Sequence, residues 1–394
     1  MPTPDLVVVG AGVMGTWTAL TALERGRSVT LLDAFGPGDP RSTSGDESRI
    51  LRFGHGRERV YATWARESRA RWIELGEETG EPIFVKTGVA WLAHADGGFE
   101  ADSEATLHSL GIPVERLAPE AAADRWPIAA DGLAFVIHEP EAGVVRARAG
   151  VRAAARRVEA LGGEIRRDRA WPGRVTNGRL QSVVTPDGRS HAAETFVFAA
   201  GPWLPGLFPE VIGQRIRVTR QDVLYLGTPG GDRSFDAPAF PAWIDYDDAF
   251  YGIPALDGRG TKLAPDDYGP EVDPDTLDRV VDPATITAAR AFVRRRLPRL
   301  AGAPIVETRV CQYEATSDTH FVIDRHPDLE NVWLVGGGSG HAFKHGPRIG
   351  HYLVDRLDGV SDPELDERFS VTRPRTAGRG MRSAVPGWAI DPPR

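Results

Sequence analysis

The stretch LVVVGAGVMG at residues 6–15 decides the fold of this chain. Residues 6–9 form a continuous apolar run, which predicts a buried strand, and a glycine-rich turn follows directly. Residues 16–25 are predicted as a helix and residues 28–32 as a second strand. Strand, turn, helix and strand in this order make a βαβ unit, so we expect a parallel sheet of the α/β class.

The glycines of this turn have the G-x-G-x-x-G spacing of a dinucleotide-binding site. Gly10 permits the tight turn, Gly12 lets a pyrophosphate approach the backbone, and Gly15 allows the helix to pack closely on the strand. The helix dipole favours the phosphates, and Asp33, at the end of the second predicted strand, is placed for a ribose hydroxyl. The turn alone does not separate FAD from NAD.

Two further predicted strands end in glycine. Residues 195–199 lead into Gly201, and residues 332–335 lead into the segment GGGSGHAFK at 336–344. An NAD site has no need of a second glycine-rich turn far from the first. A flavin does, because its ring gains negative charge on reduction and backbone amides or a helix N-terminus supply the opposing dipole. The second turn therefore favours FAD.

Glycine-ended strands spread along the whole chain predict one nucleotide-binding domain that is interrupted by insertions. We expect an α/β fold, with a Rossmann-type FAD-binding domain (GR2-like) and an inserted substrate domain built on a mixed or antiparallel β-sheet. The FAD-binding domain is assigned residues 1–80, 144–214 and 309–371, the substrate domain residues 81–143 and 215–308, and a loosely ordered tail residues 372–394.

The composition and net charge of the chain indicate which classes of binding partner to expect. The chain has 394 residues, of which 41% are hydrophobic and 26% charged, as is typical of a folded globular protein. Its formal net charge of -8 gives no general attraction to nucleic acid or to anionic membranes, and the basic run at residues 290–299 predicts an amphipathic helix. With no secretion signal, no long apolar run and the single cysteine Cys311, a cytoplasmic address and small-molecule partners are expected. We expect a monomer, with a homodimer as the alternative.

Several segments resemble one family. The most specific are CQYEATSDTHFVIDRHP at 311–327 and GGGSGHAFKHGPRIG at 336–350, joined by GDESRILR at 45–52, FVKTGVAWL at 84–92 and FAAGPW at 198–203. Through these the chain resembles the monomeric sarcosine oxidase group of the D-amino acid oxidase superfamily of flavoproteins, over nearly its whole length. The resemblance implies a flavoenzyme that takes a hydride from the C–H beside an amine nitrogen and reduces O2 to H2O2, while water hydrolyses the imine.

The resemblance also implies roles for individual residues. Cys311 is expected to bond through sulfur to the flavin 8α-methyl, although a lone cysteine is more often an inert buried residue. Arg52 and Lys344 are expected to bind the substrate carboxylate, with ordinary salt bridging as the alternative. Lys262, one of only three lysines in the chain, is expected beside the flavin where O2 reacts, and Arg49 against the ring. The expected cofactor-binding residues are Gly10, Gly12, Met14, Gly15, Asp33, Ser44, Arg49, Gly201, Cys311, Gly338, Gly340, His341, Phe343 and Lys344.

The substrate pocket is less well defined by the sequence. Tyr251 and Tyr313 resemble tyrosines that line it in the family, but as aromatic residues they fit a core equally well. Ser44 and Asp266 stand where sarcosine oxidases have histidines, so a substrate other than sarcosine, with a larger or more cationic N-substituent, is expected. A secondary amino acid, either an N-substituted glycine or a cyclic imino acid, is the main hypothesis. The alternatives are a primary-amine oxidase acting on glycine or a D-amino acid, a carrier-linked dehydrogenase, and a flavin-bound assembly factor without activity.

His341 and His345 stand four residues apart, as in some metal sites. No third nitrogen, sulfur or oxygen ligand is indicated near them in the sequence, so we expect no metal.

Overall fold

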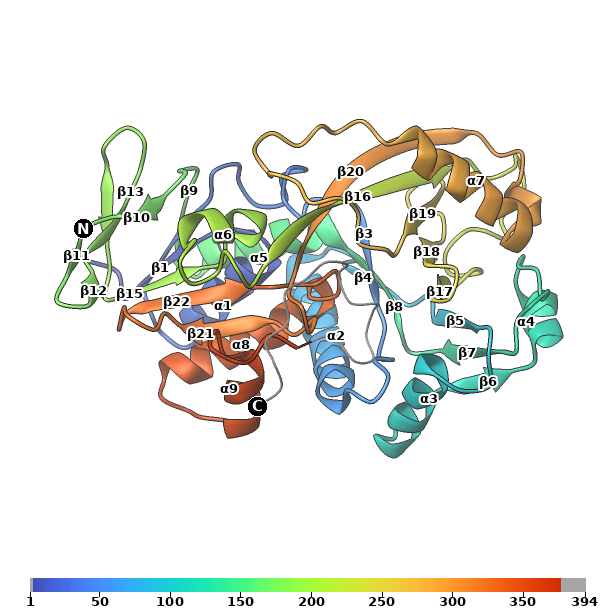
Figure 1. Cartoon of the computed structure of the whole chain (residues 1–394), viewed down its shortest axis with the longest axis horizontal. Coiled ribbons are helices and arrows are strands. Elements are labelled where there is room, and N and C mark those ends of the chain that lie inside the picture. Colours follow the sequence, from blue (N-terminus) through green and yellow to red (C-terminus); the bar gives the residue numbers. More distant parts are fainter. Residues whose placement is uncertain (1–2, 377–394) are drawn as a thin grey trace.

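The computed structural model describes residues 3–376 and centres on a six-stranded sheet of order β21-β22-β15-β1-β2-β9 (Figure 1). The strands are β1 (Leu6–Val9), β2 (Val29–Leu32), β9 (Glu164–Arg166), β15 (Thr195–Phe198), β21 (Val322–Arg325) and β22 (Val332–Gly336). All neighbouring pairs are parallel except β21 with β22. The strands expected at residues 195–199 and 332–335 therefore lie beside the first strand, as the glycine pattern predicts.

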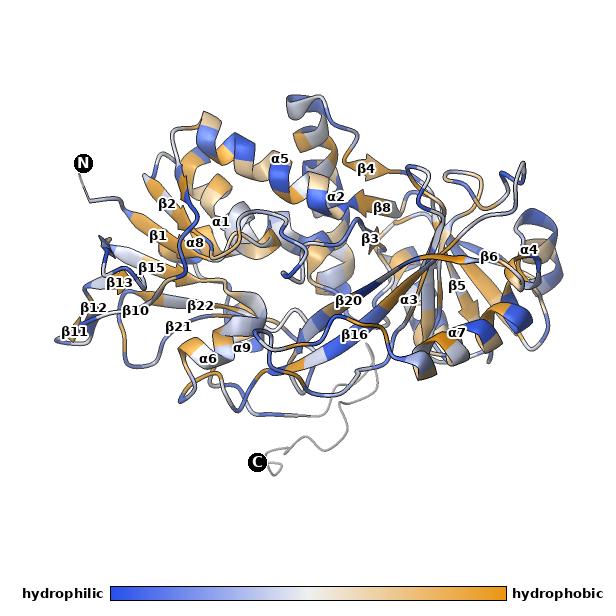
Figure 2. Ribbon diagram, turned by 90° about the horizontal axis from the view of Figure 1, so that it is seen from above, coloured by the Kyte–Doolittle hydropathy of each residue, from blue (hydrophilic) through white to orange (hydrophobic). Residues whose placement is uncertain are grey.

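The helices beside this sheet pack closely on one another because a glycine lets two of them approach. α1 (Val13–Glu24) contacts α5 (Ala147–Ala160) and α8 (Gly346–Leu357), and α8 also contacts α2 (Arg59–Thr79). A Cβ at Gly350 in α8 would lie 2.6 Å from the backbone of Trp17 in α1, so only glycine permits this helix crossing. Figure 2 shows hydrophobic residues concentrated on β1 and β2, and hydrophilic bands alternating with hydrophobic ones along α5.

The second sheet has eight strands, in the order β20-β16-β19-β18-β17-β5-β7-β6. They are β5 (Val89–Ala93), β6 (Glu115–Leu117), β7 (Phe135–Glu139), β16 (Arg217–Leu226), β17 (Ala242–Asp245), β18 (Phe250–Ile253), β19 (Thr261–Pro265) and β20 (Ile305–Ala315). The pairs are antiparallel apart from β17 with β5, which makes the sheet mixed, as expected. The long strands β16 and β20 reach from this sheet toward the other (Figure 1). Position 309, where a domain boundary is expected, falls inside β20, so the division into domains stays a proposal.

Smaller elements complete the chain. A three-stranded sheet, β3-β8-β4, joins β3 (Ser48–Leu51), β8 (Gly143–Arg146) and β4 (Phe84–Val85). The other short strands are β10 (Trp171–Pro172), β11 (Val175–Thr176), β12 (Arg179–Leu180), β13 (Ser182–Val184) and β14 (Ser190–Ala192). The remaining helices are α3 (Phe99–Ser109), α4 (Pro119–Arg125), η1 (Gly201–Trp203), α6 (Leu204–Leu207), α7 (Pro283–Arg296), η2 (Pro298–Leu300), η3 (Phe343–His345) and α9 (Pro363–Phe369). Among the described helices, none combines the length and the apolar character that crossing a bilayer requires.

Two details differ from the sequence-based expectations. α7 is the amphipathic helix expected over the basic run, but its Arg296 is buried, where it donates a hydrogen bond to the carbonyl of Ala129 at 2.7 Å and pairs with Asp245 at 3.3 Å. The start of the expected loose tail is held by Arg373, which pairs with the buried Asp318 at 2.6 Å. Residues 377–394, the rest of that tail, lie outside the described residues.

Candidate functional site

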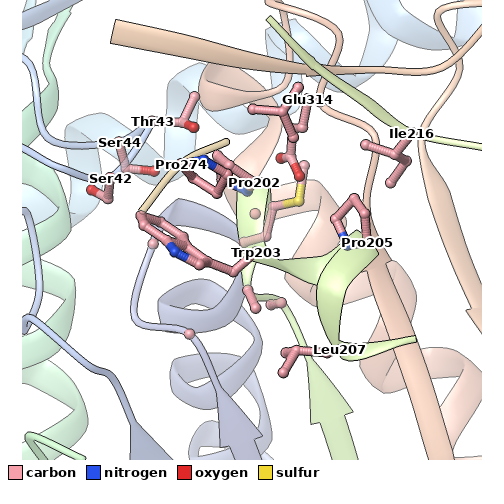
Figure 3. A pocket seen from close by; sticks show the side chains of 18 of the residues that line it. Ser42, Thr43, Ser44, Pro202, Trp203, Pro205, Leu207, Ile216, Pro274 and Glu314 are labelled. Atoms are coloured by element: carbon pink, nitrogen blue, oxygen red, sulfur yellow. The ribbon is translucent and has the colours of Figure 1, made fainter. Parts of the chain in front are cut away.

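A cavity of about 550 Å³ lies at the carboxyl ends of the six-stranded sheet. The turn after β1, the segment after β2, η1 after β15 and the turn after β22 all contribute to its lining. Open parallel sheets bind nucleotides at this edge, because the turns there present backbone amides and helix N-termini. Figure 3 shows side chains from Ser42 to Ser44, from η1 and α6, and from Pro274 surrounding the space.

Each glycine of the first turn is suited to its position for a different geometric reason. Gly10 has a φ of 109°, and a Cβ there would lie 2.3 Å from the carbonyl oxygen of Ala199. A Cβ at Gly15 would lie 1.8 Å from the carbonyl oxygen of Gly10, so Gly15 serves the close packing of α1 beneath the turn. At Gly12 the nearest atom is the Ser44 hydroxyl at 3.3 Å, and Gly12 lines the cavity. This cradle fits a bound pyrophosphate.

Asp33 and Ser44 line the cavity and accept hydrogen bonds from backbone amides around it. The Asp33 carboxylate accepts hydrogen bonds from the backbone amides of Ala11 at 2.7 Å and Gly36 at 2.7 Å, which fixes it next to the turn. The Ser44 hydroxyl accepts a hydrogen bond from the amide of Val13 at 3.0 Å. Ser44 therefore caps the N-terminus of α1 from a distant segment while it lines the cavity.

A smaller cavity of about 70 Å³ adjoins the first. Arg49, Tyr313, Gly340, His341 and Phe343 line both cavities and form the wall between them. The smaller cavity brings together the predicted substrate residues, Arg52, Lys344, Tyr251 and Tyr313, with Cys311 and Asp266. Among the predicted cofactor residues, those that line only the larger cavity are Gly10, Gly12, Met14, Asp33, Ser44, Gly201 and Gly338. Gly15 lines neither cavity and lies behind the turn.

Two buried cations point to the kind of molecule the smaller cavity accepts. The Arg52 guanidinium lies 4.9 Å from the centre of the Trp91 ring and donates to the carbonyl of Gly54, while the Lys344 ammonium donates to the carbonyl of His341 at 2.8 Å. The nearby carboxylate of Glu139 accepts hydrogen bonds from the Gly54 amide at 3.0 Å and the Trp91 indole at 2.6 Å. Two buried cations that line one small cavity are suited to a small carboxylate.

Asp46, which sequence reasoning missed, organises the other side of the cavity. Its buried carboxylate accepts hydrogen bonds from the Lys262 ammonium, from Arg49 at 2.7 Å and from the Tyr225 hydroxyl at 3.0 Å. Burial lowers the pKa of Lys262, and the negative charge of Asp46 opposes that shift. Burial alone would raise the pKa of Asp46, but Lys262 and Arg49 outweigh it and hold that pKa well below its usual range. The signal in the sequence was the spacing of Asp46 and Arg49 in the GDESR segment.

Cys311 occupies a half-buried position on β20 and lines the smaller cavity. Its sulfur lies 3.7 Å from a guanidinium nitrogen of Arg49 and 4.0 Å from the carbonyl oxygen of Thr43. The sulfur is thus close to the wall that both cavities share, where Arg49 supplies positive charge.

Glu314, on the same strand, is a second residue that sequence reasoning missed. Figure 3 shows its carboxyl among the side chains that line the larger cavity, near Ile216 and Pro205. One carboxyl oxygen has no hydrogen-bond partner among the described residues. Burial raises the pKa of Glu314 to about 8, against hydrogen bonds from the amides of Gly338 and Gly337. A neutral acid that can donate a hydrogen bond therefore faces the cavity below that pH.

A parallel nucleotide-binding sheet with a second sheet beside its cofactor cavity, and a small cavity with buried cations adjoining it, is the arrangement of a flavin-dependent oxidoreductase. Residues 5–356 match the model of the family described as FAD dependent oxidoreductase (DAO), and the chain belongs to this family. It is an FAD-dependent oxidoreductase.

Relatives extend over most of the chain. The monomeric sarcosine oxidase of Bacillus sp. (strain B-0618) is 30% identical over 386 residues, which cover 94% of this chain and 96% of the relative. The N-methyl-L-tryptophan oxidase of Salmonella arizonae is 28% identical over 89% of this chain and 94% of its own length. The solved structure of fructosamine oxidase from Aspergillus fumigatus (Amadoriase II) has the same fold, with a TM-score of 0.80 at 23% identity, covering 94% of this chain and 90% of that one.

Proposed function

We propose that this chain is an FAD-dependent oxidase of a secondary amino acid, either an N-substituted glycine or a cyclic imino acid. The observation that carries the proposal is the pair of buried cations, Arg52 and Lys344, in a small cavity that shares a wall with the cofactor cavity. A carboxylate bound to both cations would be held next to that wall, with its α-carbon and amine beyond it. The relatives named for sarcosine and for N-methyl-L-tryptophan support a secondary amine.

The cofactor in this proposal is FAD, attached through Cys311. The Gly10 turn would hold the pyrophosphate, Asp33 a ribose, and Arg49 and Phe343 the flavin side of the shared wall. Bound FAD would supply a two-electron acceptor: the CH–NH unit would lose a hydride and a proton to become an imine, O2 would take up the two electrons and two protons as H2O2, and water would hydrolyse the imine. We also propose a monomeric, cytoplasmic protein with the two-domain division given above.

The chain itself would contribute binding, orientation and charge. Arg52 and Lys344 orient the substrate, and Tyr251 and Tyr313 limit the room beside its nitrogen. The substrate amine must be neutral to release a hydride, so activity is expected to rise with pH through the pKa of the bound amine. The Lys262 ammonium, paired with Asp46, would supply positive charge where O2 is reduced.

The visible spectrum of the purified protein, before and after acid precipitation, tests the cofactor. Yellow colour that stays with the precipitated wild-type protein and leaves the Cys311→Ser variant supports the covalent bond, whereas flavin released from the wild type contradicts it. Anaerobic addition of N-alkyl glycines and cyclic imino acids then tests the substrate class. Bleaching by these compounds supports the proposal, whereas bleaching only by glycine or D-amino acids, with release of ammonia, favours the primary-amine alternative.

The lysines offer a matched test of the oxygen reaction. Lys262→Met is expected to slow reoxidation of the reduced protein by O2 by roughly 100-fold, the scale of one lost charge-stabilising group. The rate at which the substrate bleaches the flavin under anaerobic conditions should change much less. Lys86→Met removes an exposed lysine that pairs with Glu141 and is the control. Equal reoxidation rates in Lys262→Met and Lys86→Met would remove Lys262 from the mechanism.

A further inference from the structure

Three buried histidines from distant parts of the chain meet beside the smaller cavity. His341 precedes η3, His345 is its last residue, and His55 follows β3. The ring centroids of His55 and His345 are 5.4 Å apart, and those of His341 and His345 are 6.0 Å apart. One ring nitrogen from each lies within 4.8 Å of the other two. The expectation of no metal rested on the lack of a third ligand near His341 and His345, and that reason is wrong because the fold brings His55 to them.

Backbone carbonyls fix the proton on two of the three rings. His55 Nδ1 lies 2.9 Å from the carbonyl oxygen of Phe53, and His341 Nε2 lies 2.9 Å from the carbonyl oxygen of Thr319. A carbonyl only accepts hydrogen bonds, so these nitrogens carry the protons, and His55 Nε2 and His341 Nδ1 keep their lone pairs. Metal-binding histidines are oriented in the same way, with the second ring nitrogen donating to a carbonyl.

The third ring completes a set of nitrogen donors. His345 is fully buried, and neither of its ring nitrogens has a hydrogen-bond partner among the described residues. His55 is equally buried, and its Nε2 has no such partner in the described part of the chain. A metal ion binds to an unprotonated ring nitrogen, and the three rings bring one such nitrogen each to within 4.8 Å of the other two.

We propose that His55, His341 and His345 bind one transition-metal ion of the zinc or copper kind. Imidazole nitrogens suit these ions, and the cluster contains no carboxylate, which disfavours calcium and magnesium. Bond lengths of about 2.0–2.1 Å to zinc require the three nitrogens to approach to about 3.4 Å of one another, a small inward rotation of the rings. The charges of Arg52 and Lys344 oppose a cation here, so the affinity depends on the full three-nitrogen set.

The position of the cluster suggests what the ion does. Phe321 stacks on His341 with centroids 4.8 Å apart, and Tyr61 lies 5.5 Å from His345, so aromatic rings enclose the cluster. Lys344 stands directly before His345 in η3 and lines the smaller cavity. The ion ties the segment after β3 to η3, and through η3 it fixes the position of Lys344. Its role is structural, since of the three histidines only His341 lines the cavities.

Metal analysis of the full-length protein tests this proposal independently of any amine oxidation. The wild type, exposed to Zn2+ or Cu2+ and then dialysed, is expected to retain about one equivalent by mass spectrometry of the metals, and X-ray absorption should show nitrogen ligands at about 2.0–2.1 Å. His345→Gln and His55→Gln should each lose the ion. His108→Gln, which removes an exposed histidine of α3, is the control and should retain it.

A second measurement covers variants that fold poorly. Added Zn2+ or Cu2+ should raise the Tm of metal-stripped wild type and of His108→Gln. A folded wild type that holds no metal and shows no Tm change with either ion would overturn the proposal. Retention of a full equivalent by folded His345→Gln would also overturn it, since the ion would then lie elsewhere, for instance at His94, Asp245 and Asp248.

Discussion

Arg52 is the side chain through which the smaller cavity would recognise its substrate most directly. Its guanidinium is buried and lies over Trp91. Arg52→Gln is expected to raise the KM for a secondary amino acid by roughly 10- to 100-fold, because a hydrogen bond to a charged group contributes about 1.5–3 kcal/mol. Steady-state kinetics measure this. Arg57→Gln, whose arginine is 84% exposed, is the control, and equal KM values for the two variants would contradict carboxylate binding at Arg52.

Glu314 makes a prediction about pH. Its pKa is raised from 4.5 to about 8, so folding takes up a proton between these values and the wild-type apoprotein loses stability as pH rises through this range. Gln cannot ionise, so the Tm of Glu314→Gln relative to wild type should increase from about pH 5 to about pH 9. Thermal unfolding of both apoproteins at these pH values checks the sign. Glu120→Gln, at an exposed position on α4, should show no such trend.

The glycines of the chain's first turn could be predicted from the sequence, because the need for glycine at each position arises within the turn itself. Gly10 needs its positive φ, and Gly15 is forced by contact within the turn. Asp46, Glu314 and His55 could not be found in this way. Their significance comes from burial and from neighbours far along the chain, such as Lys262 beside Asp46.

At the scale of elements, the segment between β2 and β3 depends on one carboxylate. Asp46 joins this segment to β19 through Lys262 and to β16 through Tyr225. Asp46→Asn leaves Lys262 and Arg49 without their buried counter-charge and is expected to destabilise the protein by about 3–5 kcal/mol. Urea unfolding measures this. Asp102→Asn, which breaks a surface pair with Arg57, should cost less than about 1 kcal/mol, and similar losses in both variants would contradict the role of Asp46.

The elements differ in how well the sequence predicts them. β1, β15 and β22 are short apolar runs that end in glycine, and their parallel pairing follows from the βαβ rule. The eight-stranded sheet was expected only as a mixed sheet. Its order could not be derived, because β17 pairs in parallel with β5, which precedes it by a long stretch of chain. Such non-local pairing depends on tertiary packing rather than on a local pattern.

At the scale of the whole molecule, the larger cavity is closed by chain from both sheets. The segment after β19 contributes Glu271 to Asp275 to its lining, and the turn after β1 contributes to the same lining. The indole of Trp203, in η1, donates a hydrogen bond to Asp275 at 2.8 Å across this boundary. A dinucleotide in the cavity would therefore touch both parts of the chain and couple them.

This coupling predicts where binding of FAD stabilises the fold. Reconstitution of apoprotein with FAD is expected to slow amide hydrogen exchange of residues 266–281 at least tenfold, since a ligand that binds only the closed form suppresses local opening. The turn between β13 and β14, which the cavity does not include, is the internal control and should exchange at the same rate with and without FAD. Unchanged exchange over 266–281, with FAD bound, would mean that the nucleotide fold alone holds the cofactor. Slower exchange confined to this segment and the first turn would instead show that the two sheets close on it together.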